Sequence, residues 1–279
     1  MMHLIVRACA VAILGLGMLP AVWPQGSGGT QQQGQPGAQQ APAQPGTPAA
    51  PAVSAAAAKE EDDAYKLVYE ARSGDPRQLI QLGEAFVGKY PNSLYTGTVH
   101  SQLATAYLNV NQPDKMIDSG EKALAANPNN VDVLPLMAWA IPRRANTVPQ
   151  LEKAINYAQR AINLLSTMPK PAEVDDAKFA EMKNDRLAQC RSGIGTAYFK
   201  VQKYDQAITE LSQAVRLASE PDAVDYYVLG MANERTSHFT DAIAAFDKCA
   251  AGPGPVQAQC RNLSAETKRK AQNSLEAPR

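Results

Sequence analysis

Apolar side chains between Gly193 and Cys249 recur as two matched sets that lie 35 residues apart. The matched pairs are Ile194 and Leu229, Gly195 and Gly230, Tyr204 and Phe239, Ala207 and Ala242, Ile208 and Ile243, Leu211 and Phe246, and Ala214 and Cys249. A constant shift of this length is typical of stacked repeat architectures. Within each set the apolar positions fall three or four residues apart, as on one face of a helix. Each unit is therefore predicted to consist of two antiparallel helices.

The order of residue types in these units resembles the tetratricopeptide repeat. In that family a small residue in the first helix and an alanine early in the second let the two helices approach closely. Gly195 and Ala207 hold these places in one unit, and Gly230 and Ala242 hold them in the next. The resemblance implies an all-α fold, a right-handed superhelical solenoid of antiparallel helix pairs with a C-terminal capping helix.

Looser units precede these two, so the repeat domain is expected to span residues 59–273, followed by a short tail at 274–279. One earlier unit has Met116 where alanine is usual, and the unit that begins near Met137 needs about four inserted residues between its helices. No segment alternates with period two for long enough to form a strand. After two helices before Pro91, further helices are expected at 94–110, 113–126, 131–141, 148–165, 173–201, 204–217, 222–235, 239–250 and 255–273.

The helix at 173–201 is predicted to be longer than its neighbours, because the segment lacks proline and would extend for about 43 Å. Its first part is mostly charged, with Phe179, Met182 and Leu187 on one side. Such an extension either packs across the edge of the solenoid or offers its apolar side chains to another chain.

The first 58 residues divide into two segments. Residues 1–23 carry Arg7 and then an apolar run, which is the length of a secretory signal rather than of a membrane span. The bulky Trp23 leaves no clear cleavage site, so an uncleaved N-terminal anchor is the alternative. Residues 24–58 contain only Gln, Pro, Ala, Gly, Ser, Thr and one Val. This composition predicts a disordered tether. An exported protein of the bacterial cell envelope or periplasm is expected.

Three cysteines remain beyond the leader, and disulfides can form in an exported protein. In the register of the repeat family, Cys249 lies late in a second helix and Cys260 lies early in the next one. The resemblance thus implies a Cys249–Cys260 bridge that holds the capping helix, with two buried thiols as the alternative. Cys190 is then expected to be a packed small residue.

Catalytic and metal-binding patterns are absent from the sequence. Only His100 and His238 lie beyond the leader, and neither has a Cys, Asp or Glu partner at ligand spacing. No phosphate-binding loop is present either. Without the leader the chain has 26 basic and 27 acidic residues, so no basic field would hold a nucleic acid. We expect no enzyme activity, no cofactor and no metal.

Binding of a protein or peptide is the remaining expectation, because a solenoid of helix pairs forms a concave surface. In the family that surface is lined by first-helix positions. Here they correspond to Thr98, Ser101, Gln102, Thr105, Trp139, Gln189, Ser192, Thr196, Tyr227 and Met231. The leading hypothesis is a non-enzymatic scaffold. The alternatives are a structural protein that self-associates as a homo-oligomer through the long helix, and an accessory subunit of an envelope enzyme or assembly complex.

Overall fold

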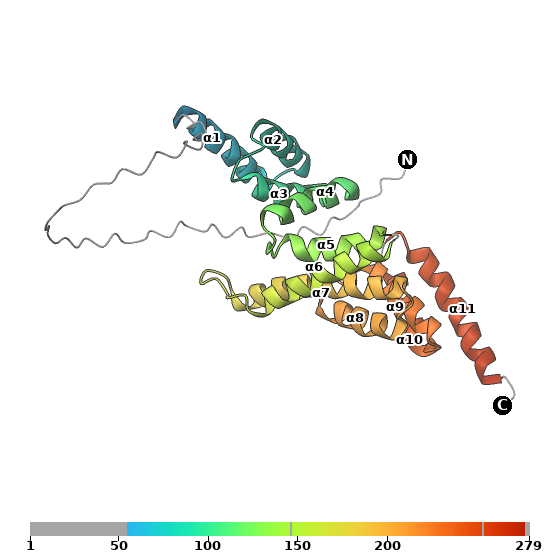
Figure 1. Ribbon diagram of the computed structural model, residues 1–279. Coiled ribbons are helices and arrows are strands. Elements are labelled where there is room, and N and C mark those ends of the chain that lie inside the picture. The colour runs from blue at the N-terminus through green and yellow to red at the C-terminus, as the bar shows by residue number, and fades with distance from the viewer. Residues whose placement is uncertain (1–54, 146, 253, 277–279) are drawn as a thin grey trace, which may run out of the picture.

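The computed structural model describes residues 55–145, 147–252 and 254–276, which form eleven α-helices and contain no strand (Figure 1). The expectations for residues 1–54 and for the tail after 276 lie outside the described residues. The helices are α1 (Ala55–Ala71), α2 (Pro76–Lys89), α3 (Thr96–Asn109), α4 (Pro113–Ala126), α5 (Val133–Arg144), α6 (Val148–Ser166), α7 (Asp176–Lys200), α8 (Tyr204–Leu217), α9 (Ala223–Arg235), α10 (Phe239–Ala251) and α11 (Gln257–Glu276).

Each odd-numbered helix packs against the even-numbered helix that follows it, and each pair packs against the next. Five pairs, α1/α2 to α9/α10, are therefore stacked along the chain. In Figure 1 the helix α1 lies at one end of the stack and α11 lies at the other. The sequence prediction of an all-α solenoid of helix pairs with a final capping helix is confirmed.

Three turns inside helix pairs share one backbone geometry. Asn111, Gln202 and Ser237 have φ values of 56°, 61° and 62° and lie between the first and second helix of their pairs. After each of them, an amide donates to a carbonyl five residues earlier, as from His238 to Asn233 at 2.8 Å. A left-handed residue is a common way to end a helix. The same turn thus recurs with the same pairing of helices.

Close helix contacts depend on glycine at the positions that the repeat register indicated. A Cβ atom added to Gly195 would lie 2.6 Å from Cγ of Leu211, and one added to Gly230 would lie 2.6 Å from Cδ1 of Phe246. The two contacts are equivalent, since both pairs differ by the same 35 residues. Ala207 and Ala242 are fully buried in the facing helices. The predicted small-residue contacts are therefore present in both units.

Several boundaries differ from the sequence prediction. Helix α1 begins at Ala55, so the last four residues of the predicted linker at 24–58 belong to a helix. Helix α7 has 25 residues rather than about 29. It starts later because Asp175 caps it, accepting hydrogen bonds from the amides of Ala177 and Lys178. Helix α5 ends at Arg144 instead of residue 141, because Pro142 is accommodated within its last turn.

Within the described part of the chain, none of the helices combines the length and the apolar character needed to cross a membrane.

Candidate partner-binding surface

Helix α3 carries four of the ten predicted groove residues. Thr98 is exposed, and Ser101, Gln102 and Thr105 are half-buried. The Ser101 hydroxyl accepts a hydrogen bond from the Asn130 amide at 3.3 Å. The Oε1 atom of Gln102 is buried and has no hydrogen-bond partner among the described residues. These side chains therefore place hydroxyl groups along a single helix, beside an amide oxygen that is buried and unsatisfied.

Trp139 of α5 is half-buried and is covered on one face by an arginine. The guanidinium carbon of Arg143 lies 4.2 Å from the centroid of the Trp139 ring, and its Nη1 donates to the Trp139 carbonyl at 2.9 Å. Stacking of this kind fixes both side chains. Trp139 is thus held rigidly by its own helix, and only part of its surface is accessible.

Arg143 also belongs to a buried polar network that joins three helices. Its Nη2 donates to Asp225 Oδ1 at 2.8 Å, to Asp222 Oδ2 at 3.1 Å and to Ser192 Oγ at 3.1 Å. Ser192 in turn donates to Asp225 at 2.6 Å. We call Arg143, Ser192, Asp222 and Asp225 the inner network. It links α5, α7 and α9, the first helices of three successive pairs.

Burial is the main influence on the charge state of the inner network. The Asp225 side chain is 9% exposed and that of Arg143 is 15% exposed. Burial raises the pKa of the Asp225 carboxyl, and the Arg143 guanidinium opposes that rise. Asp222, which caps α9 through the Val224 amide, is more exposed. Sequence patterns did not reveal this network, because its hydrogen-bonded partners lie 33 to 82 residues apart along the chain.

Two predicted groove residues on α7 do not face an open surface. Ser192 is 1% exposed and is held within the inner network, and Thr196 is 5% exposed. The close packing of α5 on α7 explains their burial, because a Cβ at Gly193 would collide with the main-chain carbonyl of Ala138. Ser192 and Thr196 are therefore core residues. Gln189, one turn earlier, is half-buried.

Tyr227 and Met231 of α9 are the last two predicted groove residues, and both lie beside the capping helix. They pack against the cluster formed by Ala242, Phe246 and the Cys249–Cys260 pair. The Tyr227 hydroxyl accepts a hydrogen bond from Gln259 of α11 at 2.9 Å. The interpretation of these two side chains as open anchors is thus weakened, because α11 engages them.

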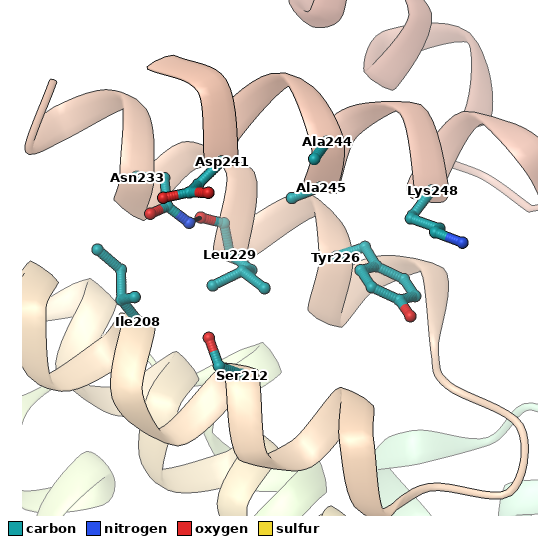
Figure 2. Close-up of a pocket in the computed structure, with 9 residues that line it drawn as sticks. All are labelled: Ile208, Ser212, Tyr226, Leu229, Asn233, Asp241, Ala244, Ala245 and Lys248. Atoms are coloured by element: carbon teal, nitrogen blue, oxygen red, sulfur yellow. Dashed lines mark hydrogen bonds between the residues drawn. The ribbon is translucent and has the colours of Figure 1, made fainter. Parts of the chain in front are cut away.

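A recess lies between α8 and α10, with α9 also lining it. It has a volume of about 420 Å³, with Ile208 and Ser212 on one wall and Leu229 of α9 as its floor. Figure 2 shows Asp241 and Lys248 at opposite ends of the facing helix α10. No sequence pattern indicated this recess, whose two walls are the second helices α8 and α10.

The cysteines lie as the repeat register implied. Cys249 and Cys260 are bonded in the structure, with Cα atoms 5.9 Å apart, and the bond connects α10 to α11. Cys190 is a free, buried thiol, and burial raises its pKa to about 12. The described residues contain no group of three or more His, Cys, Asp or Glu side chains placed to hold a metal ion.

Comparison with known families identifies one segment. Residues 188–221 match the model of the tetratricopeptide repeat, a region that covers the second half of α7 and all of α8. A comparison with curated protein sequences found no match.

Similar solved structures include MamA 41-end from Desulfovibrio magneticus RS-1, with 16% identity and a TM-score of 0.47 over 68% of this chain and 93% of that one. PilW, described as a widely conserved type IV pilus biogenesis factor, has 14% identity and a TM-score of 0.47 over 79% of this chain and 96% of its own. Pseudomonas aeruginosa pilF has 15% identity and a TM-score of 0.46 over 79% and 94%.

Proposed function

We propose that this chain, which matches the tetratricopeptide repeat over residues 188–221, is a non-enzymatic scaffold that binds another protein or peptide. The fold is that of a protein-interaction scaffold, since stacked helix pairs present an extended surface to a partner. The observation that carries the proposal is the polar row on α3, which we define as Thr98, Ser101, Gln102 and Thr105. Its Gln102 amide oxygen lacks a partner among the described residues.

An unsatisfied buried acceptor costs free energy, about 1–3 kcal/mol for a neutral group. Because this oxygen is buried, a partner that supplies an N–H group would remove that cost only if the Gln102 side chain turned outward on binding. The exposed Thr98 lies one turn before Gln102 on the same helix, and Trp139 and Gln189 extend the surface to α5 and α7. We therefore propose that a peptide with free backbone or side-chain donors lies along α3 towards Trp139.

Affinity capture tests this surface. The full chain is immobilised and used to recover proteins from an envelope extract, alongside Thr98→Arg with Gln102→Ala and a control Gln159→Arg. Gln159 is exposed on α6, a second helix, so the control adds the same charge away from the polar row. We expect recovery of the specific partner to fall by about tenfold or more in the α3 variant, equivalent to about 1.4 kcal/mol. Equal recovery by all three chains would contradict the proposal.

Self-association through α7 is the second candidate function. Phe179 and Met182 are half-buried rather than buried. Against this candidate, Arg186 pairs with Asp132 and Asp185 accepts two hydrogen bonds from Ser219, which hold this part of α7 within the molecule. Light scattering of the full chain tests it, because a dimer that dissociates when Phe179 and Met182 become serine would favour self-association over the α3 surface. An accessory role in an envelope enzyme or assembly complex would instead require a catalytic partner chain.

We also propose that residues 1–23 direct export and place the repeat domain in the cell envelope. The proposal rests on the basic and apolar sequence of that segment. Fusing residues 1–58 to a phosphatase that is active only outside the cytoplasm tests it. Phosphatase activity that disappears when Leu14 and Leu16 are replaced by arginine would support export, and inactivity of the unaltered fusion would exclude it.

A further inference from the structure

The recess between α8 and α10 has an apolar middle that solvent can reach. Leu229 of α9 and Ala245 of α10 line it and are buried, and Ile208 of α8 is half-buried. Ala244, on the same wall as Ala245, is exposed. The volume of about 420 Å³ is therefore accessible to apolar side chains of a partner.

Comparison with the preceding helix pair explains why the recess is open. At the 35-residue shift, Ala245 and Tyr226 correspond to Glu210 and Arg191. Those two earlier side chains form an ion pair at 2.8 Å, which joins α7 to α8. Ala245 and Tyr226 both line the recess instead. The later unit thus has a small residue and an aromatic ring where the earlier unit has a salt bridge of its own.

Charges of opposite sign lie at the two ends of this recess. Figure 2 shows Asp241 and Lys248 apart on α10, and they lie in its first and last turns. Both are exposed, and within the described part of the chain neither side chain forms an ion pair or a hydrogen bond. The equivalent residues of α8 are the uncharged Gln206 and Gln213. The two charges favour α10 through its dipole, yet they remain free to pair with a partner.

We propose that this recess binds an amphipathic helix of another protein, which lies antiparallel to α10. An acidic residue of that helix faces Lys248, and a basic residue two turns later faces Asp241. Apolar side chains between them pack on Leu229 and Ala245. Laying an apolar helix face into a groove is a common mode of peptide recognition. The antiparallel direction follows from the charges, because it places the acidic residue towards the N-terminus of the bound helix and the basic residue towards its C-terminus.

The spacing of the charges favours a helix over an extended peptide. Asp241 and Lys248 are seven residues apart, which is about 10.5 Å along the axis of α10. A second helix matches this distance with side chains at i, i+3, i+4 and i+7, all on one face. An extended peptide would cover it in about three residues, and its side chains at i and i+3 would point to opposite sides. Such a peptide could not reach both charges at once.

A pair of designed peptides tests the proposal on the full chain. Both are labelled, alanine-rich helices of about 18 residues, long enough to be helical in water. The matched peptide carries Glu, Leu, Leu and Lys at positions i, i+3, i+4 and i+7, and the reversed peptide has its Glu and Lys exchanged. We expect fluorescence anisotropy at low ionic strength to show about tenfold tighter binding of the matched peptide. High salt should reduce this preference, because it screens exposed charges.

Exchanging the charges of the protein is the decisive variant. Asp241→Lys with Lys248→Asp should reverse the preference, so that the reversed peptide binds more tightly. A loss of stability in the variant does not alter this readout, since both peptides are compared on the same protein. Asp205→Lys with Arg216→Asp makes the matched exchange in the first and last turns of α8, at residues that do not line the recess. This control should keep the original preference.

Three results would overturn the proposal: equal binding of the two peptides by the unaltered chain, no binding at millimolar peptide, or a preference that survives the exchange at Asp241 and Lys248. Methyl NMR signals should shift on Ile208, Leu229 and Ala244 when the matched peptide is added, and shifts confined to other helices would place the binding elsewhere and contradict the recess.

Two further measurements separate this surface from other contacts. Light scattering without peptide should show no association that depends on Asp241 and Lys248. Association that the exchanged variant loses would assign the recess to a second copy of the chain and overturn an external partner. The α3 variant Thr98→Arg with Gln102→Ala should bind the matched peptide as the unaltered chain does. The recess does not depend on the polar row, so each proposal can fail without the other.

Discussion

Gly193 and Gly195 show how two neighbouring positions serve two different contacts. A Cβ at Gly195 would meet mainly the Leu211 side chain within its own helix pair, with Cγ at 2.6 Å and the main-chain nitrogen farther away at 3.1 Å. A Cβ at Gly193 would meet the main-chain carbonyl of Ala138 in the preceding pair. A side chain can move aside, but a helix backbone can do so only with the whole element. One glycine thus sets the spacing within a repeat, and the other sets the spacing between repeats.

This difference predicts how much stability an alanine substitution costs at each glycine. We expect Gly193→Ala to lower the free energy of unfolding by about 1–3 kcal/mol, because the added methyl overpacks the α5–α7 contact. Gly195→Ala should lower the free energy of unfolding by less than Gly193→Ala does. Gly88→Ala is the control, since an added Cβ there meets nothing within 4 Å. It should be neutral or stabilise by up to about 1 kcal/mol through helix propensity. Urea titration followed by circular dichroism measures all three, and equal effects at Gly193 and Gly88 would contradict the packing.

His100 is predicted to make the fold less stable at mildly acidic pH. Burial and the nearby Lys122 lower the pKa of its imidazole, with Asp118 opposing, and its Nδ1 is buried without a partner among the described residues. The unfolded chain therefore binds more protons than the folded chain as pH falls through about 6.5, so stability falls in that window. Above this pH window the His100 imidazole is neutral in both the folded and the unfolded chain. His100→Gln should remove this dependence in thermal melts between pH 8 and 5, and an unchanged slope would exclude His100 as its source.

The capping helix α11 is polar and short of apolar contacts, so its attachment relies on a few specific bonds. Asp247 of α10 accepts hydrogen bonds from Ser264 at 2.5 Å and from Lys268 at 3.3 Å. Lys270 pairs with Glu234 of α9 at 2.6 Å. Exposed ion pairs contribute little on their own, about 0–1 kcal/mol each. The Cys249–Cys260 bond is therefore expected to be the main constraint on this helix.

Reduction of that bond should loosen α11 before the rest of the solenoid. Closing a loop of about a dozen residues stabilises a fold by roughly 3 kcal/mol in the chain-entropy treatment. We expect Cys260→Ser to increase hydrogen exchange in α11 while α3 to α8 stay protected. Mass spectrometry of the unreduced protein should yield a peptide pair that joins Cys249 to Cys260, with Cys190 alkylated only after unfolding. A linkage through Cys190 would require a different register for the last two repeats.

Helix positions could be predicted from the sequence largely because local signals fix them. Pro113 and Pro149 lie in the first turns of α4 and α6, where a missing N–H costs nothing. The signal for the later start of α7 is also local, since Asp175 is a good N-cap residue. The start was placed too early because the residues before Asp175 have the same helix-forming character. The beginning of α1 at Ala55 was missed because the alanine run continues the uncharged composition of the preceding segment, although Ser54, just before it, is a residue type that favours helix N-caps. The groove positions stay a prediction, but the burial of Ser192 and Thr196 could not be read from the sequence, because it depends on a neighbouring repeat.

Contacts between repeats hold the molecule together as a unit, and the sequence period does not reveal them. Hydrophobic packing is divided among three clusters, which cover α1 to α7, α7 to α10, and α9 to α11. The inner network crosses these divisions, because Arg143 of α5 reaches Asp225 of α9 past Ser192 of α7. In a solenoid each repeat otherwise contacts only its neighbours, so stability is nearly a sum of local terms. A bond that spans three pairs makes their unfolding cooperative.

Removing one partner of this network should therefore be more damaging than removing both. Asp225→Ala leaves the Arg143 guanidinium with only the more exposed Asp222, and Arg143→Met leaves Asp225 buried without its cation. Breaking a buried ion pair in this way costs about 3–5 kcal/mol, whereas apolar replacement of both partners is often neutral. We expect each single variant to lower the urea midpoint and to separate the unfolding of α9–α11 from that of α3–α8. The double variant Arg143→Met with Asp225→Leu should recover most of the stability and a single transition. Additive losses in the double variant would show that the two side chains act independently and that cooperativity comes from the hydrophobic contacts alone.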